Sequence, residues 1–162
     1  MGAYLKLKDI PGQATDEGHK EWILIESMSM PIYRSIPAGA KDNERTQGDT
    51  TPGDVVVTRT VDKSSPKLEI ACADGTFFKD ATIHLTNQVN KKQETFYELK
   101  LSNVIISSYS MSANKSGDPL PHEDITLSYT EFEVIYHTID PTTGENKGKV
   151  PAKYSLGKGT SS

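Results

Sequence analysis

Apolar and polar residues alternate along most of the chain, and this pattern predicts strands rather than helices. In residues 4–10, for example, Leu5 and Leu7 alternate with Lys6 and Lys8, which predicts a half-exposed strand. The other predicted strands are residues 22–30, 55–61, 77–86, 94–111 and 123–139, with a last short strand around Tyr154 and Leu156. The polar segment 87–93 predicts a turn, residues 140–151 a loop rich in Gly, Lys and Pro, and residues 157–162 a loose tail.

The segment Val55–Gly75 predicts a strand followed by the one helix that the pattern supports. Residues 55–61 are β-branched at nearly every position, which suits a pleated sheet. Ser65 is a good N-cap, Pro66 suits the first helical position, and Gly75 can end the helix in the left-handed conformation. The apolar stripe of this helix consists of Leu68, Ala71 and Cys72. We therefore expect a short α-helix at about residues 65–74, lying against a sheet or plugging one end of a barrel.

Two of the longest predicted strands change phase in the middle. In residues 94–111 the apolar positions switch parity near Ser102–Asn103, and in residues 123–139 they switch near Thr130–Glu131. Such a slip moves the apolar set to the other side of the sheet unless a bulge or kink absorbs it. Two long strands that slip in this way are typical of a strongly bent sheet. The predicted fold is mainly β: a bent antiparallel β-barrel or sandwich of two packed sheets, with one short helix.

Two stretches have a polar character that a buried core does not explain. In residues 22–30 one face begins with Ile23 and Ile25 and becomes polar at Ser27 and Ser29, which predicts core on one side and water on the other. Residues 38–54 are almost wholly polar and too long for an idle connection, so we expect this loop to bind something or to lack order in the isolated chain.

Composition fits one domain spanning residues 1–162, long enough to support its own core. The formal charge of -4, with both signs mixed along the chain, argues against a nucleic-acid partner. The single Cys72 cannot form an internal disulfide, and we expect a buried structural thiol. The N-terminal residues do not resemble a signal peptide, and no apolar run is long enough to span a membrane. We expect a protein that folds in the cytosol and needs no signal peptide for export.

The sequence offers little support for catalysis. Asp16 and His19 could begin a metal site, but no further ligand pair completes it, so a turn hydrogen bond is the preferred interpretation. The ligand-rich run 122–124 stands just before a strand, and His84 and His137 are isolated on polar strand faces. We find no nucleophile elbow, phosphate loop or dinucleotide fingerprint, and we expect no catalytic residues, cofactor or metal.

Several segments together resemble the haemolysin-coregulated protein (Hcp) family, the tail-tube subunits of the bacterial type VI secretion system. The first, Gly12–Ile23, is similar to the family's G-x-(S/A)-x-D-x-x-H-x-x-W-I segment. Residues 62–68 resemble its D-K-x-S-P-x-L junction between strand and helix, and residues 103–109 its V-(L/I)-(V/I)-S-S segment. Residues 123–129 and 154–156 resemble the two closing strands. The resemblance covers nearly the whole chain in the family's order, although each motif alone is weak.

The resemblance implies a non-enzymatic subunit of a homohexameric ring, whose rings stack into a tube that a contracting sheath ejects. It implies the sheath proteins and the spike protein (VgrG) as machine partners, and small effector proteins as cargo, with no nucleic acid or membrane partner. Ser27 and Ser29 correspond to the strand that faces the lumen. Residues 38–54 correspond to the extended loop that reaches a neighbouring ring. Many members have a loop rich in Gly and Ser there, whereas this chain has Lys41, Asp42, Asn43, Glu44 and Arg45.

Two other functions remain open on the sequence alone. A phage tail-tube protein would share the structural class and would differ in the kind of sheath encoded beside it. A small β-sandwich binding module, for instance for sugar, would be a monomer with an exposed aromatic patch. An enzyme would need a cleft in which His and carboxylate side chains converge.

Overall fold

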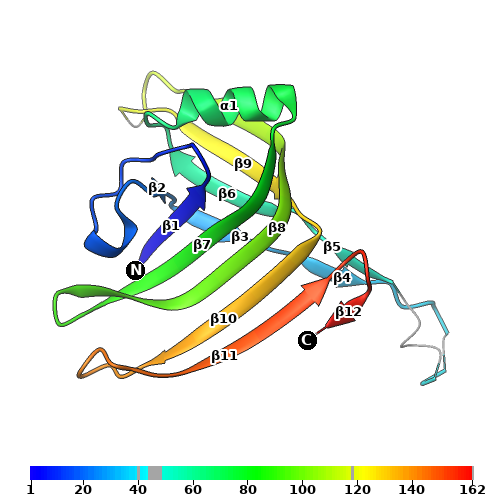
Figure 1. The fold of residues 1–162 in the computed structure, drawn as a ribbon. Coiled ribbons are helices and arrows are strands. Elements are labelled where there is room, and N and C mark those ends of the chain that lie inside the picture. The colour runs from blue at the N-terminus through cyan, green and yellow to red at the C-terminus, as the bar shows by residue number, and fades with distance from the viewer. Residues whose placement is uncertain (40, 44–48, 118, 162) are drawn as a thin grey trace.

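The computed structural model describes residues 1–162 apart from 40, 44–48, 118 and 162. In the described residues, antiparallel strands form one ten-stranded sheet and one separate two-stranded ribbon, with a single α-helix across one end (Figure 1). The strands are β1 (Gly2–Leu7), β2 (Ile23–Leu24), β3 (Ser27–Ser29), β4 (Ile32–Arg34), β5 (Thr50–Pro52), β6 (Val55–Thr60), β7 (Phe77–Val89), β8 (Lys92–Ser112), β9 (His122–Ser128), β10 (Glu131–Ile139), β11 (Asn146–Ser155) and β12 (Thr160–Ser161). The helices are the 3-10 turn η1 (Glu17–His19) and α1 (Ser65–Asp74). The predicted class, a mainly β fold with a bent antiparallel sheet and one short helix, is confirmed.

The large sheet divides into two branches, and strand β8 runs through both of them. Its first half pairs with β10 as far as Ser102, and its second half pairs with β9 from Ile105 onwards, while β7 lies along its other edge. Asn103 stands at the switch with φ +55°, a left-handed conformation that Asn tolerates better than most residues. Its side-chain amide donates to Thr130 Oγ1 at 2.7 Å, in the gap between β9 and β10. Both predicted phase slips, near Ser102–Asn103 and near Thr130–Glu131, are therefore confirmed as the places where the sheet divides. The strand predicted over residues 123–139 is, however, two strands, β9 and β10, with the second slip between them.

The segment predicted as one strand over residues 22–30 is two strands, and this decides how the sheet closes. β2 pairs with β1, whereas β3 pairs with β6, so the two strands bound opposite branches of the sheet. Between them the Ile25 amide donates to Ala3 O and the Glu26 amide donates to Thr58 O. The sheet thus curls around its core without a continuous ring of ladders, and the chain itself bridges the last gap.

Three further predictions differ from the structure in the C-terminal half and the long loop. Residues 140–151 were expected to be a loop, but β11 begins at Asn146 and carries Pro151 opposite Ile135. Pro is tolerated there because β11 is close to the edge of the sheet, where β12 pairs only with residues 154 and 155. The tail expected to be loose contains β12, and the polar stretch 38–54 contains β5.

Helix α1 occupies the predicted residues, but its N-cap is one position earlier. The cap is Ser64, which makes no side-chain capping bond, while Ser65 is the first helical residue. Ser65 Oγ instead accepts from the Asp62 amide and donates to Glu123. Gly75 ends the helix at φ +69°, as predicted. Leu68 and Ala71 are buried in the core, whereas Cys72, expected to be a buried structural thiol, is partly buried and packs against the core.

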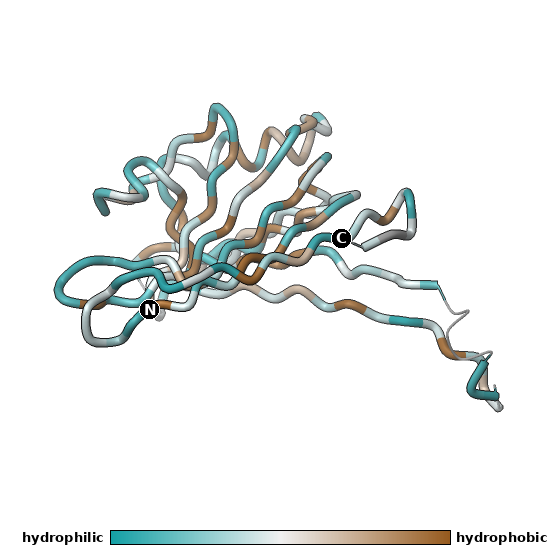
Figure 2. Tube along the Cα trace, turned by 60° about the horizontal axis from the view of Figure 1, so that its bottom comes forward, coloured by the Kyte–Doolittle hydropathy of each residue, from teal (hydrophilic) through white to brown (hydrophobic). Residues whose placement is uncertain are grey.

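The core fills the inside of the curled sheet beneath α1. It consists of the inward-facing residues of the strands, which alternate with polar residues along each strand (Figure 2). The β4–β5 ribbon extends away from this body and pairs with no strand of the large sheet (Figures 1 and 2). No helix among the described residues has the length and apolar character needed to cross a membrane.

Candidate functional site: a hydroxyl-rich sheet face

The branch of the sheet formed by β3, β6, β9 and the second half of β8 carries hydroxyl side chains on the face opposite the core. Alternation buries one side of each strand, such as Val55 and Val57 on β6, and leaves the other side at the surface. The ladder registers align two rows of side chains across the four strands. These rows are Ser27, Thr58, Asp124 and Ser110, and Ser29, Val56, Thr126 and Ser108. All eight side chains are exposed or partly buried, and we call this surface the hydroxyl face.

Two hydrogen bonds join side chains of the hydroxyl face. Thr58 Oγ1 donates to Asp124 Oδ1 at 2.8 Å, and the hydroxyls of Ser108 and Thr126 lie 3.4 Å apart. Beside the face, Ser107 Oγ donates to Asp54 Oδ2 at 2.8 Å. Thr60 donates to Glu26 at the edge of the face. Hydroxyls with carboxylate partners make a wetted surface that offers weak, interchangeable hydrogen bonds rather than an anchoring site. The predicted polar positions Ser27 and Ser29 are both exposed on this face.

The four strands of the hydroxyl face end in two unpaired edges. In the described ladders β3 pairs only with β6, so its other edge has no partner strand. Past Ile105 the second half of β8 pairs with β9 alone, because β7 begins opposite that residue. Unpaired edges of this kind offer backbone donors and acceptors to another chain. The same small sheet can therefore be extended on both sides.

A buried ion pair fixes the core side of this sheet to helix α1. Arg59, on β6, contacts Glu123 of β9 at 2.5 Å and Asp62 at 2.6 Å, and both Arg59 and Glu123 have side chains no more than 1% exposed. Arg59 also donates to Leu24 O at 3.0 Å, and Tyr109 OH donates to Glu123 Oε2 at 2.5 Å. No buried side-chain polar atom among the described residues lacks a hydrogen-bond partner. This pairing locks the junction of β6, β9 and α1.

Burial and charge shift the pKa values of two groups in this cluster. Burial is the largest influence on Tyr109, and with the hydrogen bond to the Glu123 carboxylate it raises the pKa of the phenol well above its ordinary value. For Asp62, burial disfavours ionisation, but the bonds from Arg59 and Ser64 outweigh it and hold the pKa of that carboxyl below its ordinary value. Tyr109 is therefore a fixed donor and Asp62 a fixed anion at neutral pH.

The run His122–Asp124 does not form one site. Strand alternation places Glu123 in the buried ion pair, while His122 and Asp124 lie on the opposite face. Among the described residues no group of three His, Cys, Asp or Glu side chains is placed to hold a metal ion. The run was expected to be ordinary charged loop residues just before a strand. Instead it begins β9, with Glu123 in the core and His122 and Asp124 on the opposite face.

The histidines expected to be isolated on strands are joined in a network. Asp16 Oδ2 accepts from His19 Nδ1 at 2.7 Å, which confirms the predicted turn hydrogen bond. His19 also contacts His84 at 2.9 Å, His84 lies 3.6 Å from Glu98, and Glu98 accepts from His137 at 2.6 Å. The prediction that His84 and His137 stand alone is therefore wrong. Their partners lie far away in sequence and are brought together only by strand register.

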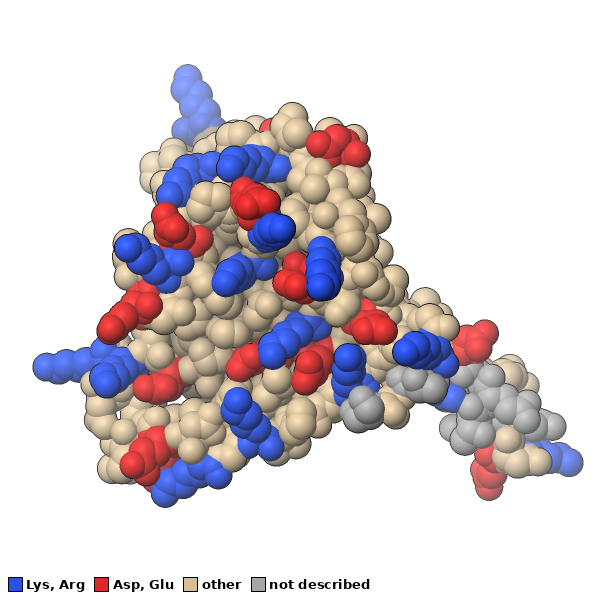
Figure 3. Space-filling view, viewed as in Figure 1, with Lys and Arg blue, Asp and Glu red and all other residues tan. Residues whose placement is uncertain are grey.

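Three of the predicted ring-stacking residues, Lys41, Asp42 and Asn43, are exposed in the segment between β4 and β5. The other two, Glu44 and Arg45, lie outside the described residues. Charged side chains of both signs are interspersed over the face of the molecule seen in Figure 3. That face therefore presents no single-sign stripe of the kind that nucleic acid favours.

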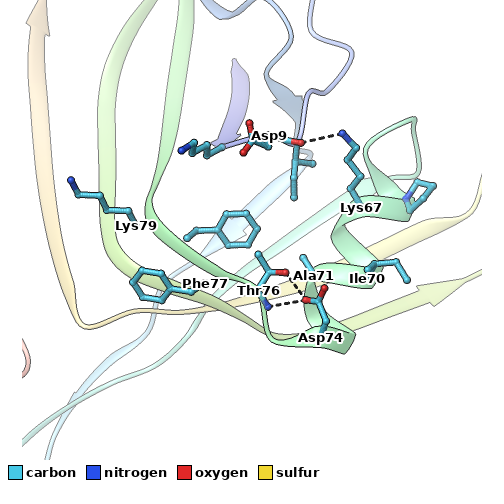
Figure 4. Close-up of a pocket in the computed structure, with 12 residues that line it drawn as sticks. Asp9, Lys67, Ile70, Ala71, Asp74, Thr76, Phe77 and Lys79 are labelled. Carbon is cyan, nitrogen blue, oxygen red and sulfur yellow. Dashed lines mark hydrogen bonds between the residues drawn. The ribbon is translucent and has the colours of Figure 1, made fainter.

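A groove beneath α1 is the largest of the described cavities, with a volume of about 640 Å³. It runs between the helix and the start of β7, and Figure 4 shows Ile70 and Phe77 at its margin. Two of its polar side chains are hydrogen-bonded: Lys67 Nζ donates to Asp9 O at 3.2 Å, and Thr76 donates to Asp74. The residues that line it include no histidine, serine or cysteine.

Comparison with known proteins places this chain in the class of type VI secretion proteins. A solved structure described as a type six secretion system protein covers 99% of both chains with a TM-score of 0.89 and 26% identity. The model of the family described as "Type VI secretion system effector, Hcp" matches residues 4–136. The chain belongs to the Hcp family, as its sequence motifs indicated.

Individual relatives agree with this assignment. The protein hcp1 of Pseudomonas aeruginosa is 27% identical over 151 residues, which cover 93% of this chain and 91% of that protein. Hcp1 from Salmonella typhimurium has the same fold, with a TM-score of 0.75 at 18% identity over 99% of this chain and 98% of the other. A type VI secretion system effector from Yersinia pestis shares the fold with a TM-score of 0.71 at 21% identity, over 94% and 98% of the two chains.

Proposed function

We propose that this Hcp protein is a non-enzymatic tube subunit that closes with identical copies into a six-membered ring. The observation that carries the proposal is the hydroxyl face with its two unpaired edges. When the β3 edge of one copy meets the β8 edge of the next, the contact is head-to-tail, and a head-to-tail contact that closes makes a ring. The hydroxyl faces then join into one continuous inner wall. The number six comes from the family resemblance.

The chemistry of the hydroxyl face suits a lumen through which cargo slides. Ser27, Ser29, Ser108 and Ser110 project short side chains, so the bore stays open, and their hydroxyls stay hydrated. Small effector proteins would be held there by many weak polar contacts. We further propose that rings stack through the β4–β5 ribbon and residues Lys41, Asp42, Asn43, Glu44 and Arg45. The sheath, the spike protein and export without a signal peptide follow from the machine to which the family belongs.

The ring is tested by native mass spectrometry and electron microscopy of the purified protein. We expect a six-subunit mass and annular particles, because a head-to-tail contact whose rotation closes makes a ring. A protein that remains monomeric over a wide concentration range, with no annular particles, would overturn the proposal.

The lumen is tested by the substitution Ser29→Gln. We expect rings of unchanged mass that retain less co-purifying effector protein, because six longer side chains would crowd the bore. Ser116→Gln is the matched control, since Ser116 is an exposed serine in the loop before β9 and away from the hydroxyl face. Equal retention by the two variants, measured by quantitative mass spectrometry, would count against a lumenal position for Ser29.

A further inference from the structure

Residues 11–22 lie on the outside of the large sheet, and a pair of histidines is at the centre of their contact with it. His19, at the end of η1, is 3% exposed and stacks on Tyr4 of β1 with ring centroids 4.3 Å apart. Its Nε2 lies 2.9 Å from Nδ1 of His84 on β7. Trp22 closes over both imidazoles, with centroids 4.9 Å from His19 and 4.6 Å from His84. The two rings are thus held in contact in a largely water-free space.

The hydrogen bonds of the His19–His84 contact limit how many protons the two rings can carry while they stay in contact. An ionised carboxylate only accepts, so His19 Nδ1 must carry the proton that it shares with Asp16. The His19–His84 contact then needs a single proton between its two nitrogens. This requirement is met when the pair is neutral and also when it carries one positive charge. When both imidazoles are protonated, two N–H groups face each other at hydrogen-bond distance, and the contact becomes repulsive.

Some of the charged groups around the pair favour its protonation and others oppose it. Asp16 from the η1 segment and Glu98 from β8 favour protonation, and Glu98 lies 3.6 Å from His84. His137 on β10 and Lys100 on β8 oppose a charge on His84. Lys6 on β1 lies over the Trp22 ring, 5.6 Å from its centroid, and Tyr4 supplies a neutral phenol. The carboxylates can balance one positive charge on the pair, but a second proton has no acceptor between the rings.

We propose that the His19–His84 contact is an acid-sensitive latch, which holds residues 11–22 on the sheet at neutral pH and releases them when both rings are protonated. Its release would uncover Tyr4 and Trp22 while leaving the core on the other face of the sheet intact. The inference stands on the geometry of one chain and is independent of ring formation.

The pKa of His84 gives the pH range in which the latch opens and shows that acid, not base, opens it. Burial, with the positive charges of His19, His137 and Lys100, lowers the pKa of His84 to about 4, against the opposing pull of Glu98. When residues 11–22 are released, His84 stays on β7 but gains contact with water and loses the nearby charge of His19, so its pKa rises from about 4 towards the ordinary value of about 6.5. The released state therefore binds more protons than the docked state between these values. The stabilisation by the latch is therefore fully present above about pH 6.5 and is lost as the pH falls towards 4.

Hydrogen exchange measured at several pH values, corrected for the intrinsic exchange rate, tests the latch. The amides of Gly12, Ala14, Glu21 and Trp22 are bonded within the segment and report its opening. We expect their protection to fall at least about tenfold between pH 7 and pH 4, because one unit of pKa difference is already a tenfold change in equilibrium. Protection in α1 should not change. Protection of residues 12–22 that is independent of pH would overturn the proposal.

Two variants and a direct titration complete the test. In His84→Gln the ring that must gain the second proton is gone, so we expect the acid-dependent loss of protection to disappear. His122→Gln removes the only histidine outside the network and should respond to acid as the natural protein does. A His84→Gln variant with an unaltered acid transition would overturn the latch. If that variant does not fold, NMR titration of the imidazole protons decides. Protonation of both rings above pH 6 would overturn the proposed latch. One ring that titrates near pH 4 would support it.

Discussion

At the scale of single residues, the buried ion pair makes the strongest stability prediction. Glu123→Gln keeps the shape of the side chain but leaves Arg59 with only Asp62 as an anionic partner, inside the core. Removing one partner of a buried pair costs about 3–5 kcal/mol, and the remaining Asp62 places our expectation near the lower value. The measurement is the free energy of unfolding from chemical denaturation.

The control for this substitution is Glu17→Gln, which makes the same change at an exposed position. We expect it to alter the free energy of unfolding by less than about 0.5 kcal/mol. Equal stability of Glu123→Gln and Glu17→Gln would mean that the ion pair does not lock the junction.

The same scale shows why part of the site was predictable and part was not. Ser27 and Ser29 were identified from alternation within one strand, which needs no knowledge of other strands. The contact of His84 with His19 joins residues 65 positions apart, so no local pattern contains it. A usable signal existed for Glu98: pairing residues 77–86 and 94–111 about a turn near residue 90 would have set it opposite His84 within two positions.

At the scale of elements, the hydrophobic periodicity predicted a strand well where one face of the strand is buried and poorly where both faces are exposed to solvent. The long strands β7 and β8 were found because their core positions recur at every second residue. β11 was missed because its residues from Asn146 to Lys153 are all exposed, with a Gly and a Pro among them. The ribbon strand β5 is only three residues long and has no buried position. Such strands exist through their ladder partners, which the sequence of the strand itself does not encode.

Turn chemistry explains a further difference at this scale. The predicted polar turn over residues 87–93 is much tighter, because β7 and β8 run up to a two-residue turn at Asn90 and Lys91. Both residues have positive φ, 50° and 65°, as the favoured two-residue hairpin turn requires. Asn is common in this position but Lys is not, so the composition alone favoured a longer connection.

At the scale of the whole molecule, the β4–β5 ribbon is the feature that a single chain explains least. Isolated two-stranded ribbons are marginally stable in water, and this one lies apart from the body of the fold (Figure 1). Ile32 and Tyr33 on β4 and Ile36 just beyond it are each at least half exposed. A ribbon with this much exposed apolar surface is stabilised when another copy covers it, which agrees with a role in stacking rings.

We therefore expect that shortening the ribbon separates stacking from ring closure. Replacing residues 36–48 by Asn-Gly would join Ser35 to Asp49, whose backbones are already bonded at 3.1 Å, through a two-residue hairpin turn. The hydroxyl face and its edges are untouched, so native mass spectrometry should give an unchanged ring, while electron microscopy should show few tubes. Lys91→Gly is the control, because it creates the same Asn-Gly turn at the β7–β8 hairpin and should leave tubes intact. Tubes of normal length from the shortened variant would show that stacking does not use the ribbon. Loss of the ring would assign the ribbon to contacts between neighbouring subunits within one ring.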